Sequence, residues 1–158
     1  MMTRWGVGPK FTLISAIYFA AILTAHFIFL NDLTFTIISH HVNLILGIVL
    51  IILGLTIFLL GGHVIDKYFV TERLCTTGVY AFMRHPVYGA WIVYIVPGII
   101  IIMGSIIGIT VPIFMYCVYK ILIVKEERYL EAKFGREYLE YASKVGALFP
   151  KIRRIYHE

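Results

Sequence analysis

The sequence predicts an all-α, multi-pass membrane protein with four transmembrane helices, the last two forming a helical hairpin, and a C-terminal amphipathic helix. The composition is the first indication, because 60% of the 158 residues are hydrophobic and only 15% are charged. Soluble domains average about 45–50% apolar and about 25% charged residues. The apolar excess excludes a soluble globular protein, a disordered chain and a disulfide scaffold.

Four apolar stretches are candidates for crossing a bilayer, which takes about 20 apolar residues, within a range of about 17–25. They cover residues 11–30, 43–60, 87–103 and 106–124, and the second is expected to end at Gly61-Gly62. Lys120 is the only charge in Gly89–Val124, and one straight helix of that length would extend about 54 Å across a hydrocarbon core of about 30 Å. The chain must therefore fold back, and Gly104-Ser105 is the expected turn.

The basic residues indicate how the spans are oriented. All 14 Lys and Arg residues precede the first span, lie between the second and third, or end or follow the fourth. The positive-inside rule then places both termini in the cytoplasm, in the plasma membrane if the organism is prokaryotic. The net charge of +5 therefore indicates orientation in a lipid bilayer, and we expect no nucleic-acid partner.

The C-terminal polar segment opens with an amphipathic pattern. Leu130, Phe134, Tyr138 and Tyr141 recur at helical spacing. Gly135 interrupts the pattern and is expected to end one helix and let a second start at a new angle. The tail after Phe149 is both basic and apolar, which predicts contact with anionic headgroups at the membrane surface.

The densest group of chemically versatile residues is the segment Leu74–Tyr88. Pro86 suits the first turn of a helix, so the third span is expected to begin there, with His85 in an extended conformation before it. The first amides of such a helix are free and its dipole is positive, so this end can bind a carboxylate or phosphate. Arg84 adds a charge, His85 a titratable ring, and Tyr80 and Tyr88 add hydroxyls and aromatic faces.

Two adjacent carboxylates, Glu126 and Glu127, follow the fourth span. At a membrane boundary such a pair is costly unless it is solvated or partnered. In a hairpin the end of the fourth span lies beside the start of the third, which brings the pair close to Arg84–Tyr88. A pocket with anion-binding amides, aromatic faces and carboxylates suits a zwitterionic or cationic ligand.

These residues resemble a known family. The pattern Gly78-x-Tyr80-x3-Arg84-His85-Pro86-x-Tyr88, then Glu126-Glu127 and Phe134-Gly135-x2-Tyr138-x2-Tyr141, is similar to the isoprenylcysteine carboxyl methyltransferase family, allied with the integral-membrane phospholipid methyltransferases. The match covers roughly Arg73 to Pro150. The resemblance implies one membrane methyltransferase domain over residues 1–158, with a cofactor-binding region at about 72–150. It implies S-adenosyl-L-methionine as methyl donor and a lipophilic or prenylated acceptor at the cytoplasmic membrane face.

The resemblance also implies site residues. The cofactor-binding residues would be Leu74, Cys75, Tyr80, His85, Pro86, Val87, Tyr88 and Glu126. We expect Arg84, His85 and Glu127 to be catalytic, with His85 as the nearest base if the acceptor is an amine. Tyr80, Tyr88 or Trp91 could face the cationic sulfonium. No Cys/His spacing typical of a zinc site is present, so no metal is expected.

Two positions depart from the prenylcysteine enzymes. Glu72 stands where they usually carry a histidine, and Leu122 where they carry an arginine implicated in substrate binding. The acceptor is therefore left open among a prenylcysteine carboxylate, a phospholipid amine and a small amine or thiol, and the oligomeric state is open too. A small four-span transporter is the alternative of another class. Transporters of this size usually keep an embedded carboxylate, and the first two predicted spans contain none.

Overall fold

The computed structural model describes residues 6–29, 34–37 and 39–151, and this part of the chain is built from helices. The long helices are α1 (Gly8–Phe29), α2 (His40–Val70) and α5 (Thr110–Phe134). α4 (Val96–Met103) and α6 (Arg136–Lys144) are shorter. Short elements connect them: η1 (Gly78–Ala81), α3 (Pro86–Gly89), the π-helical η2 (Ala90–Ile95) and η3 (Ile107–Ile109). The predicted all-α class is confirmed.

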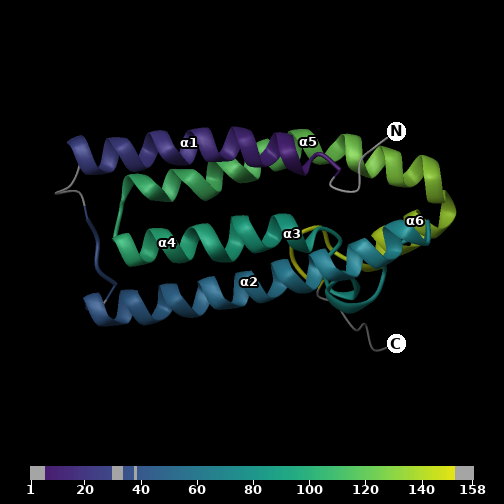
Figure 1. The fold of residues 1–158 in the computed structure, drawn as a ribbon, viewed down its shortest axis with the longest axis horizontal. Helices are drawn as coiled ribbons and strands as arrows, with labels where there is room; N and C mark the ends of the chain where they lie inside the picture. The colour runs from purple at the N-terminus through teal and green to yellow at the C-terminus, as the bar shows by residue number, and fades with distance from the viewer. Residues whose placement is uncertain (1–5, 30–33, 38, 152–158) are drawn as a thin grey trace, which may run out of the picture.

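Four helices in the described part of the chain are long and apolar enough to cross a membrane. They are Gly8–Ile28, His40–Ile65, Pro86–Met103 and Ile107–Phe134. The prediction of a four-span membrane protein is therefore confirmed, while the side that each end faces stays a prediction. The start of α1, the end of α2, the start of α3 and the end of α5 all lie at one end of the bundle, together with α6 (Figure 1).

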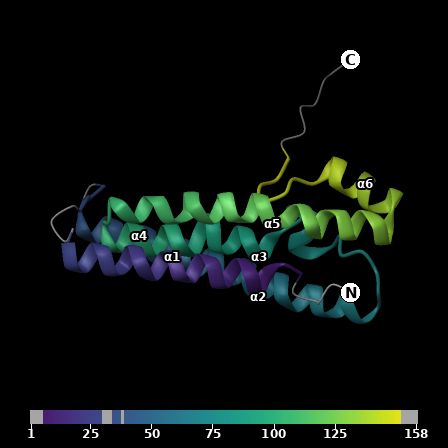
Figure 2. The ribbon, with the colours of Figure 1, turned by 90° about the horizontal axis from the view of Figure 1, so that it is seen from above.

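Close backbone approach holds two of the spans together. A Cβ atom on Gly98 of α4 would lie 2.8 Å from the carbonyl oxygen of Gly47 in α2. Small residues at such crossings let membrane helices pack without a hydrophobic driving force between them. α5 packs against α1 on the other side of the bundle, where Tyr18 and Phe114 stack with ring centroids 4.0 Å apart. The layers of the bundle are visible from above in Figure 2.

The second span does not end at Gly61-Gly62, and that prediction is wrong. α2 continues through both glycines to Val70. Gly61 packs against the ring of Pro86, because a Cβ atom added to Gly61 would lie 3.4 Å from that ring. The glycine therefore allows a close contact between helices and does not end α2. With 31 residues α2 is about 46 Å long, and α5 with 25 residues is about 37 Å. Both exceed a hydrocarbon core of about 30 Å, so their polar ends reach the headgroup layer.

The chain reverses direction after α4, at the far end of the bundle. Gly104 adopts a left-handed φ of 61° there, which favours glycine. Ser105 is buried and its hydroxyl lies 3.1 Å from Nδ1 of the buried His26, while it accepts the N–H of Gly108 at 3.1 Å. This polar cluster ties α1 to the turn between the third and fourth spans.

Two sequence signals set the local geometry at the polar end. The third span begins at Pro86, which occupies the first helical turn as predicted. Gly135 separates α5 from α6 with a left-handed φ of 52°. α6 therefore leaves the direction of α5 and folds back beside its end (Figure 2).

Candidate functional site

A cavity of about 770 Å³ lies at the polar end of the bundle. Its wall is formed by the start of α1, the end of α2, the segment from Glu72 to Trp91, the end of α5, and α6. Ligand cavities typically measure about 300–1,000 Å³, so this one is large enough for a cofactor or a substrate. Aromatic side chains dominate its lining: Phe11, Phe58, Tyr68, Tyr80, Tyr88, Trp91, Tyr129, Phe134, Tyr138 and Tyr141.

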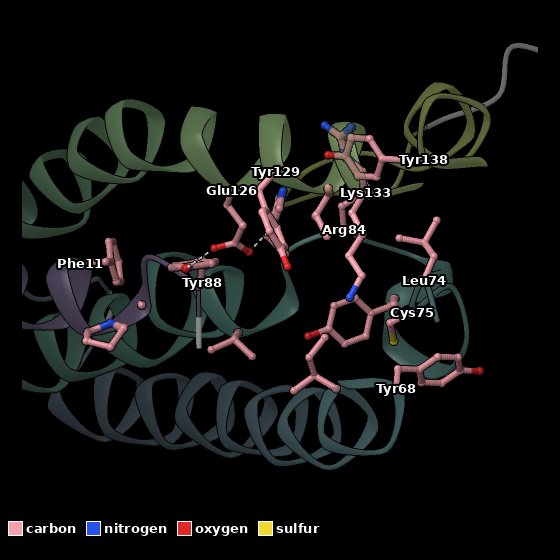
Figure 3. Close-up of a pocket in the computed structure, with 18 of the residues that line it drawn as sticks. Phe11, Tyr68, Leu74, Cys75, Arg84, Tyr88, Glu126, Tyr129, Lys133 and Tyr138 are labelled. Carbon is pink, nitrogen blue, oxygen red and sulfur yellow. Dashed lines mark hydrogen bonds and ion pairs between the residues drawn. The ribbon is translucent and has the colours of Figure 1, made fainter. Parts of the chain in front are cut away.

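Glu126 is the best-connected carboxylate of this wall. Its Oε2 accepts the Tyr88 hydroxyl at 3.0 Å and the main-chain N–H of Val7 at 3.2 Å. Its Oε1 lies 3.7 Å from Nδ1 of His85. Figure 3 shows Glu126 reaching from α5 toward Tyr88 on the opposite wall. The carboxylate is thus held in one orientation by donors from two separate parts of the chain, the turn before α1 and the start of the third span.

The second carboxylate, Glu127, orders the neighbouring basic residues. Its Oε1 forms an ion pair with the Arg84 guanidinium at 2.9 Å and lies 3.2 Å from Nε2 of His85. The ring of His85 is only 4% exposed, so it is enclosed between Glu126 on one edge and Glu127 on the other. The predicted proximity of the glutamate pair to Arg84–Tyr88 is confirmed.

Most of the predicted site residues share one cavity. Its lining includes Leu74, Cys75, Tyr80, Arg84, His85, Val87, Tyr88 and Glu126. Pro86 is fully buried at the start of α3, and Glu127 stands behind His85. Neither of these two is among the described residues that line the cavity. The assignment of all these residues to cofactor binding or catalysis stays a prediction.

A C-terminal strap, residues 145–149, holds the backbone of the basic pair. The N–H of Arg84 donates to the carbonyl of Gly146 at 2.8 Å, and the N–H of His85 donates to that of Ala147 at 3.0 Å. The Tyr141 hydroxyl, just before the strap, donates to the carbonyl of Tyr80 at 2.7 Å. The strap therefore holds the backbone of Arg84 and His85 in place, and α6 holds the backbone of Tyr80.

Burial keeps the acidic hydroxyl and thiol groups of this end in their neutral forms. Desolvation raises the pKa of the Cys75 thiol to about 11, against 9.0 for a free thiol, although a hydrogen bond with the backbone at Thr77 acts the other way. Desolvation, with help from the nearby charge of Glu127, raises the pKa of Tyr138 to about 12. The pKa values of Tyr80 and Tyr141 are raised for the same reason. At neutral pH these tyrosines keep their hydroxyl protons, and Tyr141 donates its proton to the carbonyl of Tyr80.

The two departures from the prenylcysteine pattern occupy different surroundings. Leu122 packs against the hydrophobic core of the bundle. Glu72 is exposed at the rim of the cavity, with a left-handed φ of 51° that is unusual for a residue with a side chain.

Several parts of the cavity were not predicted, among them the walls that α1 and α2 contribute. The Gly6-Val7 turn contacts Glu126 through the backbone, and a main-chain donor leaves no signal in a residue pattern. Lys133 also lines the cavity, and its position could have been found from the helical spacing that relates it to Glu126.

The family profile described as phospholipid methyltransferase matches residues 35–137, which include the third and fourth spans and both glutamates. The chain belongs to the phospholipid methyltransferase family. No solved structure matches this family member.

The curated relatives that this chain matches carry a more specific name. A probable protein-S-isoprenylcysteine O-methyltransferase of Oryza sativa subsp. indica is 31% identical over 115 residues, 67% of this chain and 60% of the relative. Protein-S-isoprenylcysteine O-methyltransferase B of Arabidopsis thaliana is 34% identical over 79 residues, 50% of this chain and 40% of the relative. The yeast protein-S-isoprenylcysteine O-methyltransferase is 32% identical over 120 residues, 68% and 49% of the two chains. The chain thus spans only 40% to 60% of these relatives.

Proposed function

We propose that this chain is an S-adenosylmethionine-dependent membrane methyltransferase, similar to protein-S-isoprenylcysteine O-methyltransferase, that acts on a lipid-like or lipidated acceptor. One observation carries the proposal: at the polar end of four apolar helices, on the wall of an aromatic-lined cavity, Glu126 accepts the Tyr88 hydroxyl and lies 3.7 Å from the His85 ring. The names of the relatives support a methyl transfer reaction.

The residues of the cavity fit the proposed methyl donor. S-adenosylmethionine would supply a methyl group on a cationic sulfur, beside an ammonium, a carboxylate and an adenosine. Glu126 presents a fixed anion for the ammonium or the ribose hydroxyls, and the uncapped first turn that Pro86 opens offers the N–H groups of Val87 and Tyr88 for a carboxylate. Tyr80, Tyr88 and Trp91 offer aromatic faces for a cation. Leu74, Cys75 and Val87 complete the apolar part of this wall.

The acceptor would reach the cavity from the lipid. Leu13 and Ala16 of α1 and Phe58 and Ile65 of α2 line the cavity, and Leu13 is 63% exposed on the apolar surface of the bundle. An apolar wall that continues onto a lipid-facing surface suits a substrate with a long hydrocarbon chain. Such a substrate would enter sideways between helices.

Catalysis would rest on positioning. Methyl transfer is an in-line displacement, so the enzyme must hold the nucleophile close and aligned. Arg84 and Glu127 fix the ring of His85 at the cavity wall. A carboxylate acceptor needs no base, whereas an amine must first lose a proton, and His85 is the nearest group for that step.

A phospholipid amine is the second candidate acceptor, and the phospholipid methyltransferase family match favours it. The position of Leu122 is consistent with an acceptor other than a carboxylate, because it packs into the core and places no cation there. A small apolar amine or thiol is the remaining choice within the family.

Two measurements test the proposal. Isothermal titration of the purified protein with S-adenosylmethionine should show binding, and Glu126→Ala should weaken it about tenfold or more. Wild-type heat equal to buffer would exclude this methyl donor. Labelled methyl transfer into a panel of prenylcysteines, phosphatidylethanolamine and small thiols should then identify the acceptor, and incorporation into none of them would contradict the lipid-acceptor part.

A further inference from the structure

A second concave surface lies on the outside of the bundle, apart from the cavity. A groove of about 360 Å³ is formed by η2, the first two turns of α5, and the strap. Figure 2 shows the strap on the side of α5 that faces away from α1. None of the described residues that line the groove also lines the cavity: Ile92, Val93, Pro112, Ile113, Tyr116, Leu148 and Phe149. A ligand of this groove would therefore be separate from one in the cavity.

The groove opens onto the lipid-facing surface of the bundle. Ile113, Tyr116 and Phe149 are exposed, whereas Ile92 and Leu148 are buried. Ile92 belongs to the third span and Tyr116 to the fourth, so the groove lies among the membrane-spanning segments. Apart from the Tyr116 hydroxyl, the side chains that line it are apolar. Such a surface suits a hydrocarbon chain.

A cation stands one helical turn from the groove. Lys120 follows Tyr116 by four positions, so the two share a face of α5, with Lys120 nearer the polar end. It is exposed, and no ion pair joins it to another residue in the described part of the chain. Lys120 lies about 9 Å deeper along the helix than Glu126. An ammonium at that depth is costly unless it reaches the headgroup layer or gains an anionic partner.

The groove and the cation together match one class of molecule. A phospholipid joins a hydrocarbon chain to a phosphate, and with its chain in the groove its headgroup would lie toward the polar end, where Lys120 stands. A zwitterionic headgroup carries its own cation beside the phosphate, whereas an anionic one leaves the phosphate free to attract a lysine. The arrangement therefore favours an anionic lipid.

We propose that this face of α5 binds an anionic phospholipid, with one acyl chain in the groove and the phosphate at Lys120. The chain contacts the strap at Leu148 and Phe149, next to the carbonyls that accept the backbone N–H groups of Arg84 and His85. The lipid thus supports the strap from its outer side. This site does not depend on the proposed methyl transfer.

The structural alternative is that Lys120 only extends to the headgroup layer, while the groove takes any neighbouring lipid. The two readings differ in the identity of the lipid at the groove. A binding site selects the anionic lipid there and loses the selection with Lys120. Ordinary contact with the bilayer gives the same lipid composition at the groove as elsewhere on the surface.

Quenching by brominated lipids measures which lipid occupies a chosen place. The chain has two tryptophans, so Trp5→Phe and Trp91→Phe with Tyr116→Trp leave one tryptophan, in the groove. The full chain is reconstituted into vesicles that mix phosphatidylglycerol with phosphatidylcholine, one of them brominated on its chains. The mixing curve gives the relative affinity of the two lipids at the probe. Phe149→Trp is a second probe of the same groove, in case the first variant does not fold.

Leu55→Trp provides the control for location. Leu55 is exposed on α2, and no charged residue stands within four positions of it. Its neighbour Gly54 packs against Tyr94, which adjoins Val93 of the groove, so the two probes lie at similar depth. Lys125→Gln provides the control for charge, because Lys125 is exposed on the same helix but about 140° around it from Lys120.

We expect phosphatidylglycerol to bind at the groove about fivefold more tightly than phosphatidylcholine, and about equally at Leu55→Trp. Lys120→Gln should bring the ratio at the groove to about one, while Lys120→Arg and Lys125→Gln should keep it. A ratio of about one without the Lys120 change, a ratio that survives Lys120→Gln, or one that Lys125→Gln removes equally overturns the site. An equal preference at Leu55→Trp also overturns it. A chain that shows the Lys120-dependent preference but does not bind S-adenosylmethionine would refute only the proposed function.

Discussion

The main-chain N–H of Val7 donates to Oε2 of Glu126 at 3.2 Å, across 119 positions of the chain. The segment before α1 therefore forms part of the wall that holds the most highly connected carboxylate of the cavity. Gly6 makes this approach possible, because it has a left-handed φ of 53° and a Cβ atom there would overlap the Glu126 carboxylate.

The first prediction concerns this contact. Gly6→Ala should displace the Glu126 carboxylate and raise the Kd for S-adenosylmethionine about tenfold or more, because the added methyl group occupies the carboxylate position. Isothermal titration measures the change. Gly62→Ala is the control, since nothing lies within 4 Å of the added atom. Equal affinity in both variants would show that the Glu126 orientation does not matter for the donor.

The second prediction concerns the C-terminal strap. A Cβ atom on Gly146 would overlap the carbonyl of Phe149, so Gly146→Ala should shift the carbonyl that accepts the Arg84 N–H. Turnover should fall about tenfold, with a smaller change in the acceptor KM, because the reacting groups lose alignment. Steady-state methyl transfer measures both constants. A raised KM with unchanged kcat would assign the strap to binding instead.

The third prediction separates the two glutamates. Glu127→Gln removes the charge that holds Arg84 and His85 but leaves the contacts of Glu126 intact. Single-turnover transfer should slow about a hundredfold, while the Kd for S-adenosylmethionine changes by less than about threefold. His85→Ala should also impair turnover. If His85→Ala transfers methyl at the wild-type rate, the ring serves only to fill the space between Glu126 and Glu127.

The fourth prediction follows from the raised pKa of Cys75. A pKa of about 11 against 9.0 leaves about a hundredfold less thiolate at pH 8 than a free thiol has. In a Cys117→Ser background, iodoacetamide should therefore alkylate Cys75 about a hundredfold more slowly than it alkylates free cysteine. The same shift stabilises the fold below pH 9, and this contribution is lost as the pH rises through about 11. Alkylation at the rate of a free thiol would contradict the burial of Cys75.

The fifth prediction concerns the crossing of the second and third spans. Gly98→Ala should lower stability by roughly 1–3 kcal/mol, because its methyl group meets the Gly47 carbonyl and the Ile51 side chain at less than 3 Å. Thermal unfolding in detergent measures the loss against the Gly62→Ala control. Equal midpoints would show that the helices can separate at little cost.

The spans could be predicted because apolar runs and basic loops are strong, local signals. The start of the third span followed from Pro86, and the meeting of Glu126 and Glu127 with Arg84 and His85 followed from the reversal of the chain. The end of α2 was mispredicted because a glycine pair can either end a helix or let it pack closely against a neighbour. Here Gly61 serves a close helix contact with Pro86, and only tertiary structure distinguishes that from a break.

Part of the rest of the site could not be predicted because backbone atoms build it. Val7 contributes an N–H, and Gly146 and Ala147 contribute carbonyls, none of which depends on a recognisable side chain. Pairing between distant backbone segments is invisible to patterns of hydrophobicity and charge. The sequence predicted the site residues Arg84, His85 and Glu126, but it did not predict the backbone atoms that position them.

The strap also determines when the site can form during synthesis. Ala147 is translated after all four apolar helices, yet its carbonyl holds the backbone of His85. A nascent chain that has been made only as far as Lys144 contains the four apolar helices of the described residues and none of the strap. Formation of these helices and completion of the backbone bonds of Arg84 and His85 are thus separate events, and only the second requires translation to pass the strap.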